Sequence, residues 1–215
     1  MIDLHTHSLF SDGELIPSEL VRRAAVKGYR AIAITDHADL SNIDFIAPRI
    51  AKVSIALSEA WGIRVIPGVE LTHVPPADIE GLAKEARKLG ARLVLCHGET
   101  IAEPVSPGTN KAALSSGIDI LTHPGLITKE DAELAARRGI YLEITARKGH
   151  SLTNGHVAKT ALAAGAKLLL NTDAHSPGDL ITREDAEKVV FGAGLSLEDY
   201  YEIIRNAEEL IKRLE

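Results

Sequence analysis

Histidine and carboxylate residues recur along the sequence where short apolar runs end. Two such places are an HxH pair, His5 and His7, and a DxH pair, Asp173 and His175. In an extended chain, residues two apart point to the same side, so each pair can present two ligands to one centre. Imidazole and carboxylate groups suit Zn, Mn or Fe, whereas a structural zinc site is typically rich in thiolates. The two pairs therefore predict a metal site.

Other residues of the same types follow the remaining apolar runs: Asp36, His37, Glu70, His97 and His123. Any one of them alone is equally compatible with an ordinary packed or surface group, and a single HxH pair is weak evidence for a metal site. Six strand ends that carry ligand-type residues together favour a multinuclear centre. Cys96 is adjacent to His97 and is expected to face the opposite way.

These residues need a frame that brings strand ends together. Apolar runs that read as strands cover residues 2–5, 31–35, 64–69, 92–97, 118–122, 140–145 and 167–172. Helical patterns cover residues 17–27, about 45–61, 77–89, 110–116, 129–138 and 154–164, with two or three helical turns in 183–214. Strands that alternate with helices predict a parallel sheet with right-handed crossovers, and we favour a closed barrel over an open sheet. Active sites of such barrels lie at the C-terminal ends of the strands.

Composition narrows the classes of function. The 215 residues form one predicted domain, 1–215, and carry 24 Lys plus Arg against 30 Asp plus Glu, a net charge of −6. No basic surface is available by default, which favours small substrates over a nucleic-acid partner. Cys96 is the only cysteine, and no signal peptide or membrane-spanning run is recognisable, so we expect a cytoplasmic protein without a membrane partner. The oligomeric state stays open.

Five segments of the sequence resemble motifs of the polymerase and histidinol phosphatase (PHP) superfamily, in matching order over nearly the whole chain. They are DLHTHSLFSDGE, ITDHAD, PGVEL, THPG and NTDAHSPGDL. The resemblance implies a distorted (β/α)7 barrel with two or three divalent ions (Zn, Mn or Fe) at the C-terminal ends of the strands. It assigns His5, His7, Glu70 and Asp173 to one ion and Asp12, His37 and His175 to a second, with Glu70 bridging to a third that His97 and His123 complete.

The loop TARKGHSLTNGH supplies the candidates for substrate contact, because its RKG resembles a substrate-side loop of histidinol-phosphatase-like members. Arg147 is expected to bind phosphate through its paired N–H donors, and Lys148 to contribute a positive charge with less directional hydrogen bonds. His150 can donate to the substrate or protonate a leaving group, and we count it with Asp12 and Arg147 as catalytic candidates.

Three nearby residues are assigned supporting or unrelated roles. Asp36 is expected to orient a ligand imidazole rather than to bind metal itself. His73 is expected to face solvent rather than to line the pocket, and His156 to have an ordinary packing or surface role within a helix.

The predicted function is hydrolysis of a phosphomonoester of a small metabolite by a metal-bridging hydroxide, with histidinol phosphate as the leading candidate. The alternative is a nucleotide phosphoesterase or single-strand nuclease, which the net charge and the scarcity of aromatic residues disfavour. A non-catalytic metal-bound module is the lesser alternative. It predicts missing ligands, and none of the nine positions is missing one.

Overall fold

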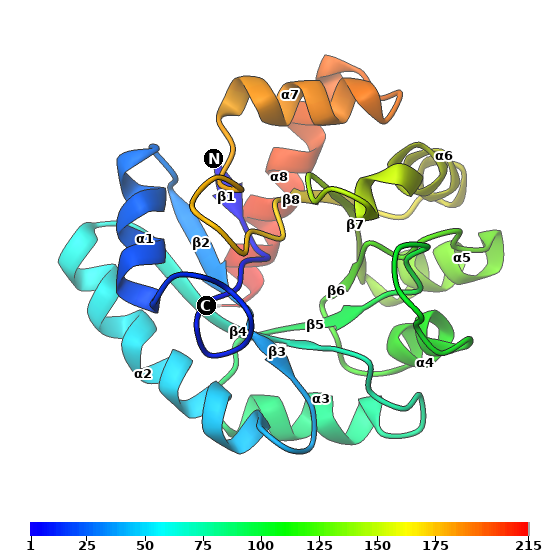
Figure 1. The fold of residues 1–215 in the computed structure, drawn as a ribbon. Helices are drawn as coiled ribbons and strands as arrows, with labels where there is room; N and C mark the ends of the chain where they lie inside the picture. The colour runs from blue at the N-terminus through cyan, green and yellow to red at the C-terminus, as the bar shows by residue number, and fades with distance from the viewer. Residues whose placement is uncertain (215) are drawn as a thin grey trace.

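The computed structural model describes residues 1–214 and shows a parallel sheet curled nearly into a barrel, with helices around its outside (Figure 1). The strands are β1 (Ile2–Asp3), β2 (Ala31–Ile34), β3 (His37–Ala38), β4 (Arg64–Leu71), β5 (Leu93–His97), β6 (Ile120–Thr122), β7 (Tyr141–Thr145) and β8 (Leu168–Asn171). The helices are α1 (Pro17–Val26), α2 (Ile43–Trp61), α3 (Ile79–Lys88), α4 (Thr109–Ser115), α5 (Lys129–Arg138), η1 (His150–Thr153), α6 (Asn154–Ala164), α7 (Arg183–Gly192) and α8 (Leu197–Arg213). No helix within residues 1–214 is long and apolar enough to cross a membrane.

The main strands pair in the order β1, β2, β4, β5, β6, β7, β8, all parallel, so the predicted distorted seven-stranded barrel is confirmed. Side chains help to close the seam between β8 and β1. The Leu4 amide donates to Asn171 Oδ1 at 2.8 Å, and the Thr172 amide donates to Asp3 Oδ1 at 3.1 Å. This use of side chains in place of a full ladder explains why β1 ends at Asp3 rather than at the predicted residue 5.

Two other features differ from the predicted elements. The two-residue strand β3 was not predicted, and it pairs with the end of β4. The C-terminal segment contains two full helices rather than two or three turns. The second, α8, begins with a capping box in which Ser196 and Asp199 each bond to the other's backbone amide.

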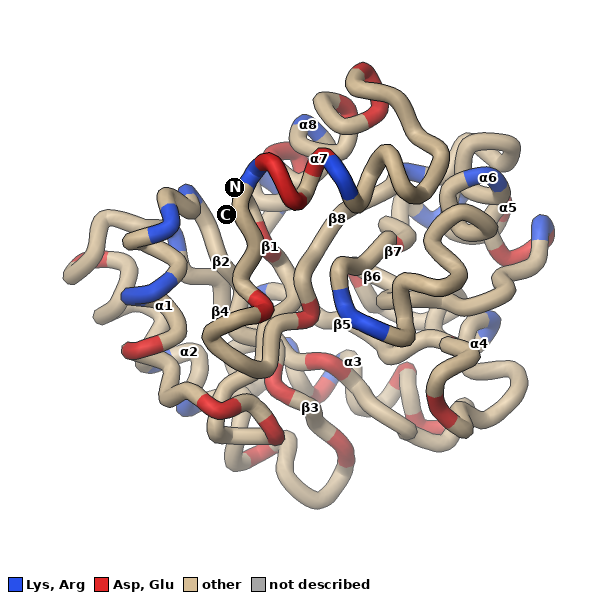
Figure 2. Tube along the Cα trace, turned by 45° about the horizontal axis from the view of Figure 1, so that its top comes forward, with Lys and Arg blue, Asp and Glu red and all other residues tan. Residues whose placement is uncertain are grey.

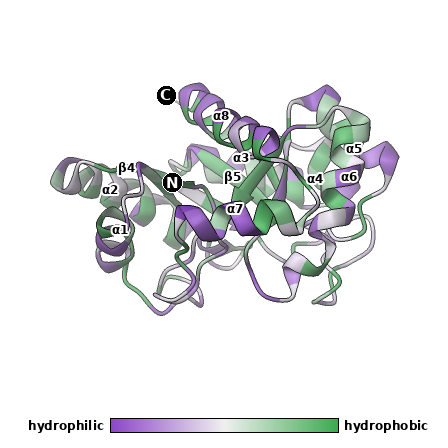
Figure 3. Cartoon of the chain, turned by 90° about the horizontal axis from the view of Figure 1, so that it is seen from above, coloured by the Kyte–Doolittle hydropathy of each residue, from purple (hydrophilic) through white to green (hydrophobic). Residues whose placement is uncertain are grey.

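The barrel interior is apolar near the starts of the strands. Ile2, Leu4, Leu93, Leu95, Ile120, Tyr141 and Leu169 form one buried cluster with Ala207, Leu210 and Ile211 of α8. This helix crosses the N-terminal end of the barrel, where Asn206 Nδ2 donates to the Leu168 carbonyl at 3.0 Å (Figure 3). One end of the barrel is therefore closed by α8, which leaves the other end for a site.

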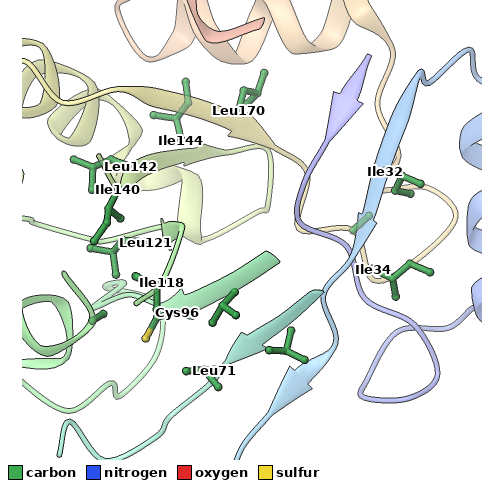
Figure 4. Packing of buried hydrophobic residues seen from close by; sticks show 14 of the residues in the cluster. Ile32, Ile34, Leu71, Cys96, Ile118, Leu121, Ile140, Leu142, Ile144 and Leu170 are labelled. Carbon is green, nitrogen blue, oxygen red and sulfur yellow. The ribbon is translucent and has the colours of Figure 1, made fainter. Parts of the chain in front are cut away.

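The outward side chains of the strands pack against the surrounding helices in a second cluster (Figure 4). Cys96 belongs to this outer cluster with Leu71 and Leu121, as expected from its position beside His97. Because side chains alternate along a strand, the neighbours of these residues point into the barrel.

Candidate metal centre

The nine ligand-type residues of the sequence gather at the C-terminal ends of the strands: His5, His7, Asp12, His37, Glu70, His97, His123, Asp173 and His175. They come from the loops after β1, β6 and β8, from the start of β3, and from the last residues of β4 and β5. Most of them are fully buried, and Asp12, His37 and His175 are more open. Three smaller groups can be distinguished, and the third of them also includes His150.

The deepest group contains His5, His7, Glu70 and Asp173. His5 Nε2 lies 3.3 Å from Glu70 Oε1, and His7 Nε2 lies 3.1 Å from Asp173 Oδ1. Asp173 adopts a left-handed backbone with φ of 53°, which is uncommon for a residue other than glycine. A single cation could take ligands from all four side chains.

The second group contains Asp12, His37 and His175, with His7 beside it. Asp12 Oδ1 lies 3.4 Å from His37 Nε2 and 3.2 Å from His175 Nε2. The loop must turn tightly to bring Asp12 here. A Cβ at the following Gly13 would lie 2.4 Å from the His7 carbonyl oxygen, so only glycine permits this turn.

The third group contains His97, His123 and His150, whose ligand atoms lie within 4.8 Å of one another. Glu70 Oε1 is 3.6 Å from His123 Nε2 and so lies between this group and the first. His150 joins it from the loop after β7, and its ring stacks on that of His123 with centroids 4.2 Å apart.

Several buried polar atoms in these groups have no hydrogen-bond partner among the described residues. They are His5 Nε2, both ring nitrogens of His7, His123 Nδ1 and Asp173 Oδ1. A buried polar atom without a partner costs about 1–3 kcal/mol. Imidazole and carboxylate atoms that face one another without hydrogen bonds are the donor set expected of a divalent cation site, so these residues fit two or three such ions.

A family model for the PHP domain matches residues 3–121, which is more than half of the chain and includes six of the nine residues. The chain belongs to the PHP domain family.

Two relatives illustrate the range of this PHP family. The uncharacterized protein MJ1295 of Methanocaldococcus jannaschii is 51% identical over 215 residues, covering 99% of both chains. The 5'-3' exoribonuclease Rnm of Salmonella typhimurium is 29% identical over 177 residues, which cover 76% of this chain and 54% of that protein.

A solved structure has the same fold. The histidinol phosphate phosphatase of Lactococcus lactis subsp. lactis Il1403, in complex with zinc, L-histidinol and phosphate, superposes with a TM-score of 0.64 at 17% identity. The match covers 91% of this chain and 94% of that one. At this identity the likeness concerns the fold of the PHP barrel alone.

Glu143 is a site residue that the sequence did not reveal. It is fully buried on β7, and its Oε2 lies 2.9 Å from His5 Nδ1 and accepts from Asn171 Nδ2 at 2.8 Å. A carboxylate held against Nδ1 directs Nε2 of His5 toward Glu70 and Asp173, as carboxylates often do for metal-binding histidines. The only sequence signal was a charged residue inside an otherwise apolar strand.

The prediction for Asp36 was wrong. This carboxylate orients no imidazole. It accepts from the Ser8 amide at 2.7 Å, from the Ser8 hydroxyl at 2.7 Å and from the Ser11 hydroxyl at 2.8 Å. Asp36 therefore fixes the loop that carries His7 and Asp12. It bonds to this loop rather than to an imidazole because the Ser8 amide and the hydroxyls of Ser8 and Ser11 lie within hydrogen-bond distance of the carboxylate.

The loop after β7 places Arg147, Lys148 and His150 on the wall of a pocket of about 190 Å³ that opens over the histidines. Arg147 Nη1 lies 3.3 Å from Asp179 Oδ2, which holds the guanidinium at the pocket edge. His150 Nδ1 lies 2.7 Å from the Thr100 hydroxyl, so its Nε2 is left to face the pocket. His156 is exposed on α6, and its Nε2 donates to the Ile127 carbonyl at 2.8 Å, in line with the surface role that was one of the two expected.

His73 is exposed to solvent, as expected, but its ring also contacts a carboxylate. Its Nε2 lies 3.1 Å from Glu103 Oε2, and Glu103 also contacts His97 and His150. Glu103 is a contact that the sequence did not reveal. Its carboxylate reaches back because the loop between β5 and α4 folds over the histidines.

The charges of the deep group are strongly coupled. Burial opposes the charged form of His5, but Glu143 and Glu70 outweigh it and raise the pKa of His5 well above its usual range. Burial alone would raise the pKa of Glu70, yet His5 and His37 hold it well below its usual range. Ionised carboxylates thus face imidazoles here, and a cation that replaces protons on the imidazoles keeps the same charge balance.

Proposed function

We propose that this chain hydrolyses phosphomonoesters of small metabolites in a reaction that needs two or three divalent cations, with histidinol phosphate as the first candidate. The ligand sets are His5, His7, Glu70 and Asp173; Asp12, His37 and His175; and His97 and His123 with Glu70 as a bridge. His150 of the third group is left free to contact the substrate. Bound divalent cations activate water and neutralise charge on phosphate oxygens.

The observation that carries the proposal is the distribution of charge around the pocket. In the seven loops that follow the main strands, residues 4–16, 35–42, 72–78, 98–108, 123–128, 146–153 and 172–182, the only Lys or Arg residues are Arg147 and Lys148. The same loops carry many Asp and Glu residues, and most Lys and Arg lie on the outer helices (Figure 2). A polynucleotide would need several basic contacts, whereas one phosphate group needs only a pair.

The chain's own groups can hold such a phosphate. Arg147 offers a fork of N–H donors, and Asp179 keeps this fork at the pocket edge. Burial lowers the pKa of His150, so its ring is neutral near pH 7. When the Thr100 hydroxyl donates to Nδ1, the proton of His150 is on Nε2, where it can donate to a phosphate oxygen.

The test is phosphate release from a panel of phosphomonoesters that includes histidinol phosphate, with Mn²⁺ and Zn²⁺ supplied separately. We expect selective turnover of one small monoester. Because an exoribonuclease is among the relatives, single-stranded RNA is the second substrate class to assay in parallel. Cation-loaded protein that releases no phosphate from any monoester would overturn the proposal, and faster cleavage of RNA would replace it with nuclease activity.

A further inference from the structure

Three ligand-type side chains meet at the rim of the pocket, above the deep group. His73 follows β4, His97 ends β5, and Glu103 lies in the loop from β5 to α4. Glu103 Oε2 is 3.1 Å from His73 Nε2 and 3.2 Å from His97 Nε2, and the three ligand atoms lie within 4.8 Å of one another. Two atoms that each bind one ion at about 2.1 Å are about 3.0–3.4 Å apart, so both contacts match the edge of a coordination polyhedron.

In the neutral tautomer of His97, no hydrogen lies between Nε2 of its ring and the Glu103 carboxylate. His97 Nδ1 lies 3.1 Å from the Gly98 carbonyl oxygen, which can only accept, so Nδ1 carries a hydrogen. In the neutral ring, Nε2 therefore has only its lone pair, and this nitrogen faces the Glu103 carboxylate. A lone pair and a carboxylate repel each other at this distance unless a proton on Nε2 or a bound cation lies between them.

The backbone also marks His73 as unusual. Among residues 1–214, the non-glycine residues with positive φ are His73 at 52°, His123 at 26° and Asp173 at 53°. Such backbone costs of the order of 1–3 kcal/mol and concentrates at functional sites. The other two residues belong to the candidate metal centre, so His73 shares a feature that is otherwise confined to candidate ligands.

Charge and access suit an ion at this place. The loops 72–78 and 98–108 contain no Lys or Arg that could pair with Glu103 from its own surroundings. The side chains of His73 and Glu103 are 43% and 39% exposed, which lets an ion enter from solvent.

We propose that His73, His97 and Glu103 form a divalent-cation site, the rim site, at the mouth of the pocket. Two imidazoles and one carboxylate with open positions suit Zn²⁺, Mn²⁺ or Fe²⁺. Nε2 is the free nitrogen of His97, so an ion there is completed either by His73 and Glu103 or by the inner residues His123, His150 and Glu70. The rim site therefore takes His97 from the third ligand set of the proposed function. The rim site does not require that the chain hydrolyses phosphoesters.

The test is Zn²⁺ binding by the full chain after chelation, followed by calorimetry and by elemental analysis of gel-filtered protein. The variants are His73→Asn, which keeps a residue that tolerates left-handed backbone, and Glu103→Gln, which keeps the side-chain size. The matched controls are His156→Asn and Glu85→Gln, both away from the pocket. We expect each rim variant to weaken the most loosely bound Zn²⁺ at least about tenfold, while tighter ions and the controls stay unchanged.

A further variant, His150→Asn, separates the two partner sets of His97. The rim site predicts that His150→Asn leaves the weakest Zn²⁺ in place. Retention of wild-type affinity in both rim variants, or loss of this ion in His150→Asn alone, would overturn the rim site. Thermal unfolding of the chelated variants at the wild-type temperature confirms that they are folded. Since the readout is Zn²⁺ binding, its failure is distinct from a failure to release phosphate.

Discussion

Inward side chains change character half-way along the strands. On β5 they run from Leu93 and Leu95 to His97, and on β7 they run from Tyr141 to Glu143. The N-terminal half of the interior is apolar and closed by α8, whereas the C-terminal half is filled with imidazoles and carboxylates. Both halves are buried to a similar degree, so burial alone does not distinguish them.

The difference lies in what burial does to the free energy of folding. Burying apolar surface in the N-terminal, apolar half of the interior stabilises the fold by about 25 cal/mol per Å². The C-terminal, polar half contains buried polar atoms without hydrogen-bond partners, each of which costs stability. We infer that the apolar half holds the barrel together and that bound cations offset the cost of the polar half.

The largest expected effect on stability is in the apolar half. Leu95 is fully buried in the barrel, so Leu95→Ala removes packed side chain and leaves a cavity. We expect the free energy of unfolding to fall by about 2–5 kcal/mol, measured by urea denaturation. A decrease in the free energy of unfolding of less than about 1 kcal/mol would show that the apolar half is not the stabilising part of the barrel.

A ligand in the polar half should show the opposite behaviour. His37→Ala removes a side chain that contacts both Asp12 and Glu70. We expect phosphate release to fall about 100–1,000-fold, as for loss of a preorganised electrostatic group, while chelated protein unfolds at nearly the wild-type urea concentration. Unfolding of the chelated variant at much lower urea would instead give His37 a role in holding the barrel together.

A variant of Glu143 tests whether the ligands of the polar half depend on neighbouring residues that hold them in position. Glu143→Gln keeps the shape of the side chain but weakens its hold on His5 Nδ1. We expect cation affinity or activity to fall about 10–100-fold, a smaller loss than for His37→Ala. Calorimetric titration with Zn²⁺ measures this loss. Wild-type affinity and activity in the variant would remove Glu143 from the site.

Arg147 gives the smallest expected effect, because it lies outside the ligand sets. Arg147→Ala removes the guanidinium that Asp179 positions at the pocket edge. We expect KM for a phosphomonoester to rise about tenfold, in keeping with loss of a charged hydrogen bond, with little change in bound metal. A change confined to kcat, with KM unaltered, would place Arg147 in the chemical step rather than in binding.

The sequence revealed the ligands better than their supports. Residues such as His5, His7 and Asp173 were recognisable because their types are rare in apolar strands and their spacing repeats at strand ends. Asp36 was misassigned and Glu143 was missed because each contacts residues far away in the sequence, Ser8 and His5 respectively. Glu103 was missed because its loop folds back onto His97 and His73. The seam between β8 and β1 depends on Asp3 and Asn171 in the same way. Local patterns do not encode these long-range pairings.

Elemental analysis of the purified chain, before and after chelation, tests the central contrast most directly. If the polar half of the barrel is a metal centre, the protein should carry two or three divalent ions per chain, and their removal should lower its thermal stability. Protein that carries no stoichiometric divalent ion, acquires none from Zn²⁺ or Mn²⁺, and is equally stable with and without them would contradict the account.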